Sequence, residues 1–366
     1  MTKYKIIFLI GDYGTGGKER QLTEIIRNLS EKNYEIHLFF KNDKSFLFGQ
    51  IKNLLCSFCS LNKNNFSPFD FFILGRYISS ISPDLLFSFS TVLSHYVFLL
   101  QIFGLVQTRL INGSIRDAPL KLNFLNRFNK VSYNVYNEVV SNSYSGLLAY
   151  NQTNRTGRYV LHNGYDMNRI SVLINNKLLF QKNDSNNFNV LMVARMDCDE
   201  KDQKTFILAA NEIISRCNNM IFYLIGGGQN RDYFESFVNK LKIKSSIHFL
   251  GEVDNVESYI KAADVSVLTS GPKHGEGIPN VVLESLACGT PVIATDNGGT
   301  KEILLHNYNG YLIKNGDYKD LANKIRFFYN NPDVLKSFSN KGVETVINHF
   351  SIEKMIFQFE SIISNG

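Results

Sequence analysis

The sequence predicts an α/β protein made of two Rossmann-like, doubly wound parallel-sheet domains. Short apolar runs typical of buried strands alternate with helical apolar repeats along most of the chain. Glycine-rich turns follow several of these strands, at the strand ends where open α/β sheets bind ligands. The length of 366 residues suits two domains of ordinary size.

The same alternation predicts where the domains begin and end. We expect a first domain over residues 1–165, a polar linker over 166–187 and a second domain over 188–348. The residues after 348 form a C-terminal helical segment, 349–366. The expected strands cover residues 6–10, 34–40, 85–89, 109–112, 139–141, 159–161, 188–193, 222–225, 247–250, 265–268, 292–294 and 309–313.

Composition sets limits on the class of protein. Hydrophobic residues make up 44% and charged residues 20% of the chain, which are globular values. No stretch is long and apolar enough for a membrane span, and the N-terminus predicts a first strand better than a signal peptide, so we expect a cytoplasmic protein. Cys56 and Cys59 form a lone C-x-x-C, which favours two ordinary thiols over zinc. The net charge of +6 is compatible with an anionic partner without requiring one.

The most informative stretch covers residues 274–302, which predict a loop, a helix, a strand and a glycine turn. Pro279 suits the first helical turn, and Gly289 suits the position just after the helix. We expect Thr300 to cap the following helix.

Two carboxylates, Glu276 and Glu284, lie on either side of this helix start, with seven residues between them. Free amides at a helix N-terminus favour phosphate, and ionised carboxylates accept hydrogen bonds from sugar diols. Phosphate and diols together describe a nucleotide sugar. The alternative is that both acids are solvated surface residues.

The segment EGIPNVVLESLACGTPVIATDNGG, residues 276–299, resembles the donor-site signature of the retaining glycosyltransferases of family 4, with their E-x7-E pair. The resemblance implies the GT-B architecture, in which two Rossmann-like domains face a cleft and the last helix, 349–366, returns to the first domain. It places Glu276 at the donor sugar, Glu284 at the ribose hydroxyls, and the backbone of Gly277 and Ile278 against the donor.

Two further clusters in the sequence suit an anionic donor. Arg195 and Lys201 follow the strand 188–193, and a cation pair beside a helix start suits a diphosphate. The resemblance gives them the role of binding that diphosphate in place of a metal, with Lys204 as an alternative to Lys201.

Gly16 and Gly17 end a glycine loop that fits neither a Walker motif nor G-x-G-x-x-G, so it serves either anion binding or close packing. The resemblance implies that this loop approaches the donor.

The acceptor side departs from the family. The family commonly has a histidine after the strand 109–112, whereas this chain has Arg116. An arginine can hold a phosphate or an acidic or hydroxyl-rich acceptor, or it can simply pair with Asp117. His95 is a second candidate near the sugar, although a structural histidine is the more economical interpretation.

Residues 120–136 predict a basic amphipathic helix, which either packs on the domain or makes peripheral contact with an anionic membrane.

The residues together with this resemblance imply a retaining, metal-independent hexosyl- or N-acetylhexosaminyl-type glycosyltransferase of bacterial surface-polysaccharide synthesis. Its expected partners are a UDP- or GDP-linked sugar and a glycan or lipid-linked acceptor, with no cofactor, no metal and no nucleic acid. We expect it in the cytoplasm, with the inner face of the cytoplasmic membrane as its working surface. The alternatives are a nucleotide-sugar epimerase of the same architecture and a non-catalytic glycan-binding subunit.

Overall fold

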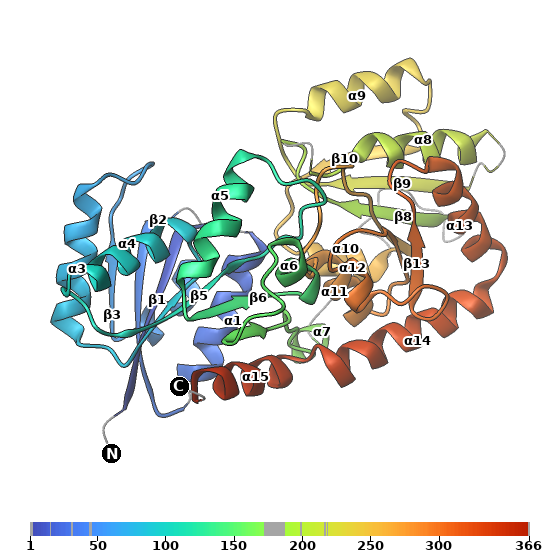
Figure 1. The fold of residues 1–366 in the computed structure, drawn as a ribbon. Helices are drawn as coiled ribbons and strands as arrows, with labels where there is room; N and C mark the ends of the chain where they lie inside the picture. Colours follow the sequence, from blue (N-terminus) through green and yellow to red (C-terminus); the bar gives the residue numbers. More distant parts are fainter. Residues whose placement is uncertain are drawn as a thin grey trace. The chain divides into compact units, whose positions relative to one another are not determined.

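The structure is a computed structural model that describes residues 3–14, 16–30, 32–43, 46–171, 187–197, 200–215, 217 and 219–364. The chain divides into two compact units, each with its own parallel sheet (Figure 1). Unit 1 comprises residues 1–118, 122–163 and 352–366, and unit 2 comprises residues 119–121 and 164–351.

Unit 1 contains a seven-stranded sheet in the order β3-β2-β1-β4-β5-β6-β7, and every neighbouring pair is parallel. The order reverses beside β1, which pairs with both β2 and β4, so β1 marks the switch point where ligands gather. The strands are β1 (Tyr4–Tyr13), β2 (Tyr34–Asp43), β3 (Ser57–Ser60), β4 (Leu85–Ser88), β5 (Arg109–Ile115), β6 (Glu138–Ser141) and β7 (Arg158–Val160).

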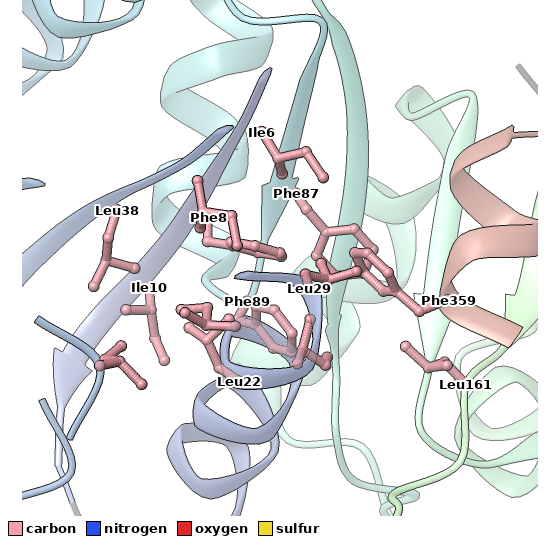
Figure 2. Close-up of a cluster of buried hydrophobic side chains, with 14 of the residues drawn as sticks. Ile6, Phe8, Ile10, Leu22, Leu29, Leu38, Phe87, Phe89, Leu161 and Phe359 are labelled. Carbon is pink, nitrogen blue, oxygen red and sulfur yellow. The ribbon is translucent and has the colours of Figure 1, made fainter. Parts of the chain in front are cut away.

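The helices of unit 1 cover this sheet. One core cluster joins β1 and β4 to α1 and to the last helix of the chain, with Phe87 and Phe359 ring centroids 5.2 Å apart (Figure 2). Arg109 donates to the carbonyl oxygen of Ile362, at 3.1 Å, which satisfies an acceptor near the end of that helix. The helices are α1 (Gly17–Ser30), α2 (Phe46–Ile51), η1 (Lys52–Leu54), α3 (Phe69–Ile81), α4 (Thr91–Ile102), α5 (Phe124–Ser132), η2 (Tyr133–Val135), α6 (Tyr144–Ala149) and α15 (Ile352–Ser364).

Unit 2 contains a six-stranded parallel sheet in the order β10-β9-β8-β11-β12-β13. Its switch point is β8, which pairs with both β9 and β11. The strands are β8 (Phe188–Val193), β9 (Met220–Ile225), β10 (Ile247–Gly251), β11 (Val265–Leu268), β12 (Val292–Thr295) and β13 (Gly310–Ile313). The helices are α7 (Asn168–Ser171), α8 (Gln203–Ile214), α9 (Arg231–Lys240), α10 (Val256–Ala262), α11 (Asn280–Ala287), α12 (Thr300–Ile303), α13 (Tyr318–Asn330) and α14 (Pro332–His349).

The two doubly wound parallel sheets confirm the predicted fold class. The prediction for Gly289 is also confirmed, because this residue follows α11 with a φ of +73°. Thr300 was wrongly predicted as a cap: it is the first residue of α12, and Gly299 occupies the cap position.

Several elements differ from the sequence prediction. The β1 strand continues through Gly11 to Tyr13, because Asp12 and Tyr13 still pair with β2. The sequence gives no clear pattern for β3, α2 or α3. Their apolar runs are short or mixed with polar residues, as in a loop. Within the part of the chain that the structure describes, no helix is long and apolar enough to cross a membrane.

Candidate functional site

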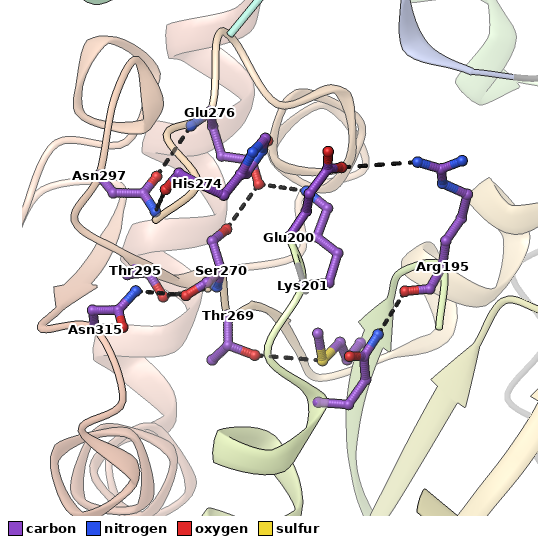
Figure 3. Close-up of polar contacts among 12 residues, drawn as sticks. Arg195, Glu200, Lys201, Thr269, Ser270, His274, Glu276, Thr295, Asn297 and Asn315 are labelled. Carbon is purple, nitrogen blue, oxygen red and sulfur yellow. Dashed lines mark hydrogen bonds and ion pairs between the residues drawn. The ribbon is translucent and has the colours of Figure 1, made fainter. Parts of the chain in front are cut away.

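The candidate site of unit 2 lies where β8, β11 and β12 end, at the carboxyl edge of the sheet. The strand β8 leads to Arg195, β11 leads to Ser270, and the loop before α11 carries Glu276 (Figure 3). Because the strands are parallel, these segments lie at one edge although the sequence separates them.

Glu276 is the centre of this cluster, and only 7% of its surface is exposed. Its Oε1 atom contacts the Nζ atom of Lys201 and accepts a hydrogen bond of 2.8 Å from the hydroxyl of Ser270. Its Oε2 atom lies 3.4 Å from Nε2 of His274. The carboxylate is thus surrounded by donors, as a buried charge requires.

These partners fix the charge state of Glu276. Burial alone raises the pKa of the carboxyl, but the Lys201 ammonium and the His274 ring outweigh it, so the pKa lies below its ordinary value. Burial lowers the pKa of His274, yet the Glu276 carboxylate dominates and raises it overall. At neutral pH Glu276 is therefore an ionised acceptor and not a proton donor.

A second set of contacts holds the backbone of Glu276. The Glu276 amide donates to Oδ1 of Asn297 at 3.2 Å, and the Gly299 amide donates to the Glu276 carbonyl at 2.7 Å. Asn297 also donates from Nδ2 to the carbonyl of His274, at 2.8 Å. Gly298 has a φ of +54°, and a Cβ atom there would lie 2.2 Å from the Glu276 carbonyl oxygen. The turn 297–299 therefore positions Glu276 and tolerates only glycine at its centre.

Lys201 is positioned by the start of α8. It forms an isolated antiparallel bridge with Ser270, and the amide of Asp202 donates to the carbonyl of Thr269 at 3.0 Å. Asp202 caps α8 by accepting from the amide of Thr205, also at 3.0 Å. Lys201 thus lies beside Glu276, whereas Lys204, the alternative, is exposed on α8.

Arg195 is more open than Lys201, with 71% of its side chain exposed. Its guanidinium lies 3.7 Å from Asp197 and 3.8 Å from Glu200, and its carbonyl accepts from Gln203 at 2.7 Å. The side chain is therefore available to a ligand, while the backbone is fixed. The glycine turn after β9 lies against this loop, since a Cβ at Gly226 would be 2.2 Å from the Ala194 carbonyl oxygen.

Glu284, the second acid of the pair, is buried in α11. Burial, with Glu257 and Glu284 adding to it, raises the pKa of the Cys288 thiol to about 12. Glu284 therefore acts electrostatically on Cys288. In the loop before α11, Gly277 and Ile278 are both buried, and the Ile278 side chain packs in the core with Val282.

The remaining candidates belong to unit 1. Gly16 and Gly17 are exposed at the start of α1. Arg116 follows β5, with its guanidinium over the ring of Phe89. His95 lies in the body of α4 beside Phe128 and Tyr136, and burial lowers its pKa.

Sequence reasoning did not select Ser270, His274 or Asn297 as site residues. His274 lies two residues before Glu276, which offered a weak signal, but no local pattern identifies the other two. Metal independence stays a prediction. The chain contains one Asp-x-Asp spacing, a pattern that can bind a metal ion, at Asp197-Cys198-Asp199. Residues 198 and 199 of this pattern lie outside the described part of the chain. Among the described residues, no group of His, Cys, Asp and Glu could hold a metal ion.

Comparison with known proteins finds similarity mainly in the C-terminal half. Residues 175–345 match the family model of group 1 glycosyl transferases. EpsD of Bacillus subtilis is 31% identical over 45% of this chain and 42% of its own length. N-acetyl-alpha-D-glucosaminyl L-malate synthase of Bacillus anthracis is 32% identical over 38% of this chain and 36% of its own.

A third relative matches a longer segment. The UDP-Gal:alpha-D-GlcNAc-diphosphoundecaprenol alpha-1,3-galactosyltransferase of Escherichia coli is 27% identical over 56% of this chain and 53% of its own length. The chain thus spans less than two thirds of the length of these three curated relatives. The matches support the superfamily of GT-B glycosyltransferases.

Solved structures match the whole chain. Anabaena HepE in complex with UDP and glucose has a TM-score of 0.82 at 20% identity, covering 99% of this chain and 100% of that one. WaaG, a glycosyltransferase involved in lipopolysaccharide biosynthesis, has a TM-score of 0.74 at 15% identity, covering 99% and 100%. The fold of this chain is therefore the GT-B fold.

Proposed function

We propose that this protein is a retaining glycosyltransferase of the family 4 type, which moves a sugar from a nucleotide diphosphate to a glycan or lipid-linked acceptor. The observation that carries the proposal is the buried Lys201–Glu276 contact at the carboxyl edge of the unit 2 sheet. An ionised carboxylate and a cation there suit a substrate that combines sugar hydroxyls with a diphosphate.

Each site residue has a distinct role in this proposal. Arg195 and Lys201 neutralise the diphosphate as the bond from the sugar to the diphosphate oxygen breaks. Glu276 accepts hydrogen bonds from the sugar and stabilises positive charge as it develops on the ring, for which a carboxylate with a lowered pKa is well suited. Glu284 binds the ribose hydroxyls, and the backbone of Gly277 and Ile278 contacts the donor. The acceptor oxygen forms the new bond, and its proton leaves with the diphosphate.

The names of the relatives favour particular substrates. HepE was solved with UDP and glucose, and the E. coli relative uses a UDP-linked hexose and a diphosphoundecaprenol acceptor. We therefore propose a UDP-linked hexose or N-acetylhexosamine as the donor, with GDP sugars as the alternative. The product is a bacterial surface polysaccharide.

The first test is a thermal-shift panel of UDP, GDP, CMP and their common sugars, with and without magnesium. A ligand that binds only the folded chain at a hundred times its Kd stabilises it by about 2.7 kcal/mol, so one nucleotide should raise Tm by several degrees. We expect UDP compounds to do so equally with and without magnesium. No shift with any nucleotide would contradict the donor site, and a shift that needs magnesium would contradict metal independence.

Products distinguish this function from the alternatives. A transferase releases UDP only when an acceptor is present, an epimerase converts the sugar nucleotide without an acceptor, and a glycan-binding subunit does neither. Chromatography of a UDP-sugar reaction with and without a lipid-linked acceptor separates the three.

We further propose that the protein acts on the inner face of the cytoplasmic membrane through residues 120–136. Helix α5 leaves its apolar side uncovered, with exposed fractions of 89% for Phe124, 62% for Leu125, 56% for Phe128 and 67% for Val131. Both of its charged residues, Arg127 and Lys130, are basic. Exposed apolar side chains with basic neighbours suit an anionic lipid surface.

Flotation with vesicles tests this contact. The chain should float with phosphatidylglycerol vesicles more than with phosphatidylcholine vesicles, and less at high salt, which screens the charges. Phe124→Glu/Phe128→Glu should reduce flotation at least about tenfold, because two anchors are lost and two negative charges are added. Phe357→Glu is the matched control, since Phe357 is 74% exposed on α15. Equal flotation of the double variant and wild type would contradict the proposal.

A further inference from the structure

The guanidinium of Arg116 is held in unit 1 with hydrogen-bonding capacity left over. Its Nε atom donates to the carbonyl of Gly113 at 3.1 Å, and its Cζ atom lies 4.5 Å from the centre of the Phe89 ring. These two contacts fix the plane of the group. Its Nη2 atom is buried and has no hydrogen-bond partner. A fixed, unsatisfied N–H of a cation is costly unless a ligand completes it.

Electrostatics around Arg116 favour an additional anion. Burial lowers the pKa of Arg116 to about 10, although the negative charge of Glu19 opposes this shift. Glu19 lies in the first turn of α1, is 5% exposed and is 3.6 Å from Lys18. Glu19 therefore shares its charge with Lys18, and its effect on the pKa is smaller than the effect of burial.

The strand that leads to Arg116 is irregular just before it. The pairing of β5 with β6 shifts register between Asn112 and Ile115, an irregularity that often re-aims side chains beside binding sites. Asn112 is fully buried in the middle of β5 and accepts from the hydroxyl of Ser114 at 2.7 Å. Ser114 contacts Tyr133 on the opposite face of the sheet from Phe89, so Asn112 does not face the Arg116 guanidinium.

An unsatisfied acceptor follows the neighbouring strand. Asn142, at the end of β6, is 4% exposed and donates its amide to the carbonyl of Ile115 at 3.2 Å. Its Oδ1 atom is buried without a partner. The carboxyl ends of β5 and β6 thus hold an unused donor on Arg116 and an unused acceptor on Asn142. Such a set suits a ligand that carries both an anionic oxygen group and a hydroxyl.

We propose that Arg116 binds an anionic oxygen group of the acceptor, a carboxylate or a phosphate, while Asn142 accepts from an acceptor hydroxyl. This inference rests on the proposed function, because it assigns unit 1 to the acceptor. The acceptor substrate of this transferase is then an acidic sugar or a sugar phosphate and not a neutral glycan.

Calorimetric titration of the full chain tests the site. UDP at a saturating concentration first fills the donor site, and then D-glucuronate, glucose 1-phosphate and neutral glucose are added separately. The first two probes distinguish a carboxylate from a phosphate. We expect one of them to bind wild type at least about tenfold more tightly than glucose, because hydrogen bonds to charged groups are the stronger ones.

Two substitutions locate that binding. Arg116→Gln should weaken binding of the preferred anion at least about tenfold. Arg116→Lys should weaken this binding less, because lysine keeps the positive charge but lacks the planar guanidinium that donates two parallel hydrogen bonds. Arg76→Gln, on an exposed residue of α3, should leave it unchanged. Equal anion affinity in Arg116→Gln and wild type, or no preference for either anion over glucose, would overturn the inference. Both results leave UDP binding in unit 2 as it was, whereas loss of UDP binding by wild type contradicts the proposed function instead.

Discussion

Glu276→Gln should lower the turnover of sugar transfer by about 10²- to 10³-fold, the usual effect of removing one preorganised group that stabilises charge in the transition state. Glutamine keeps the shape and still accepts from Ser270, but it has no negative charge to offer the sugar ring. The Lys201 ammonium loses its charged partner at the same time. Steady-state kinetics with the UDP-sugar identified by thermal shift measures the change.

Stability measurements separate this loss from misfolding. The buried contact with Lys201 becomes a charged–neutral hydrogen bond, so we expect the free energy of unfolding to fall by about 1–3 kcal/mol with the chain still folded. Glu353→Gln on the exposed side of α15 is the matched control and should change neither quantity. If Glu276→Gln retained wild-type turnover, Glu276 would have no part in the chemistry and the assignment would fail.

The sequence predicted the Glu276 region well because the relevant signals are local. An apolar face and a glycine after the helix act through neighbouring residues, and α11 covers Asn280–Ala287, just before Cys288 and Gly289. Only Pro279 is displaced, because it occupies the cap position with an extended backbone and not the first helical turn. Strand β8 also follows its apolar run, and the loop after it carries Arg195 as the ligand rule expects.

The contacts that set the chemistry could not be predicted in this way. Lys201 and Glu276 are 75 residues apart, and they meet only because β8 and β11 are neighbours in the sheet. A lysine before a helix is equally consistent with free solvent exposure. Asn297 likewise appears in the sequence as a turn residue, and its two contacts with the loop 274–276 depend on the tertiary fold. Pairing across the sheet therefore decides which of the candidate cations is the partner of Glu276.

The extended strands β1 and β5 show the same limit. Glycines in 11–17 and at 113 predicted loops from local preference, yet pairing with β2 and β6 keeps Asp12 and Ile115 in the sheet. Tertiary hydrogen bonds outweighed the intrinsic preference in both places.

Gly298→Ala should damage both stability and activity, because the added methyl has no room. A Cβ atom at Gly298 would lie 2.2 Å from the carbonyl oxygen and 2.8 Å from the amide nitrogen of Glu276, and backbone atoms cannot rotate away. The left-handed conformation costs alanine about 1–2 kcal/mol, and the overlap adds about 1–3 kcal/mol. Displacing Glu276 by about 1 Å should also lower turnover by about 10²-fold. Chemical denaturation and steady-state kinetics measure the two effects.

Gly316→Ala separates the steric effect from the conformational one. Gly316 has a φ of +73°, and nothing lies within 4 Å of the position that an alanine methyl would take there, so only the conformational cost applies. This control should lose about 1–2 kcal/mol of stability and keep its turnover within about twofold. The difference between the two variants measures how firmly the turn 297–299 holds Glu276. Equal stability and equal turnover in both would mean that the loop 274–276 yields to the methyl without cost, and that the position of Glu276 does not depend on this turn.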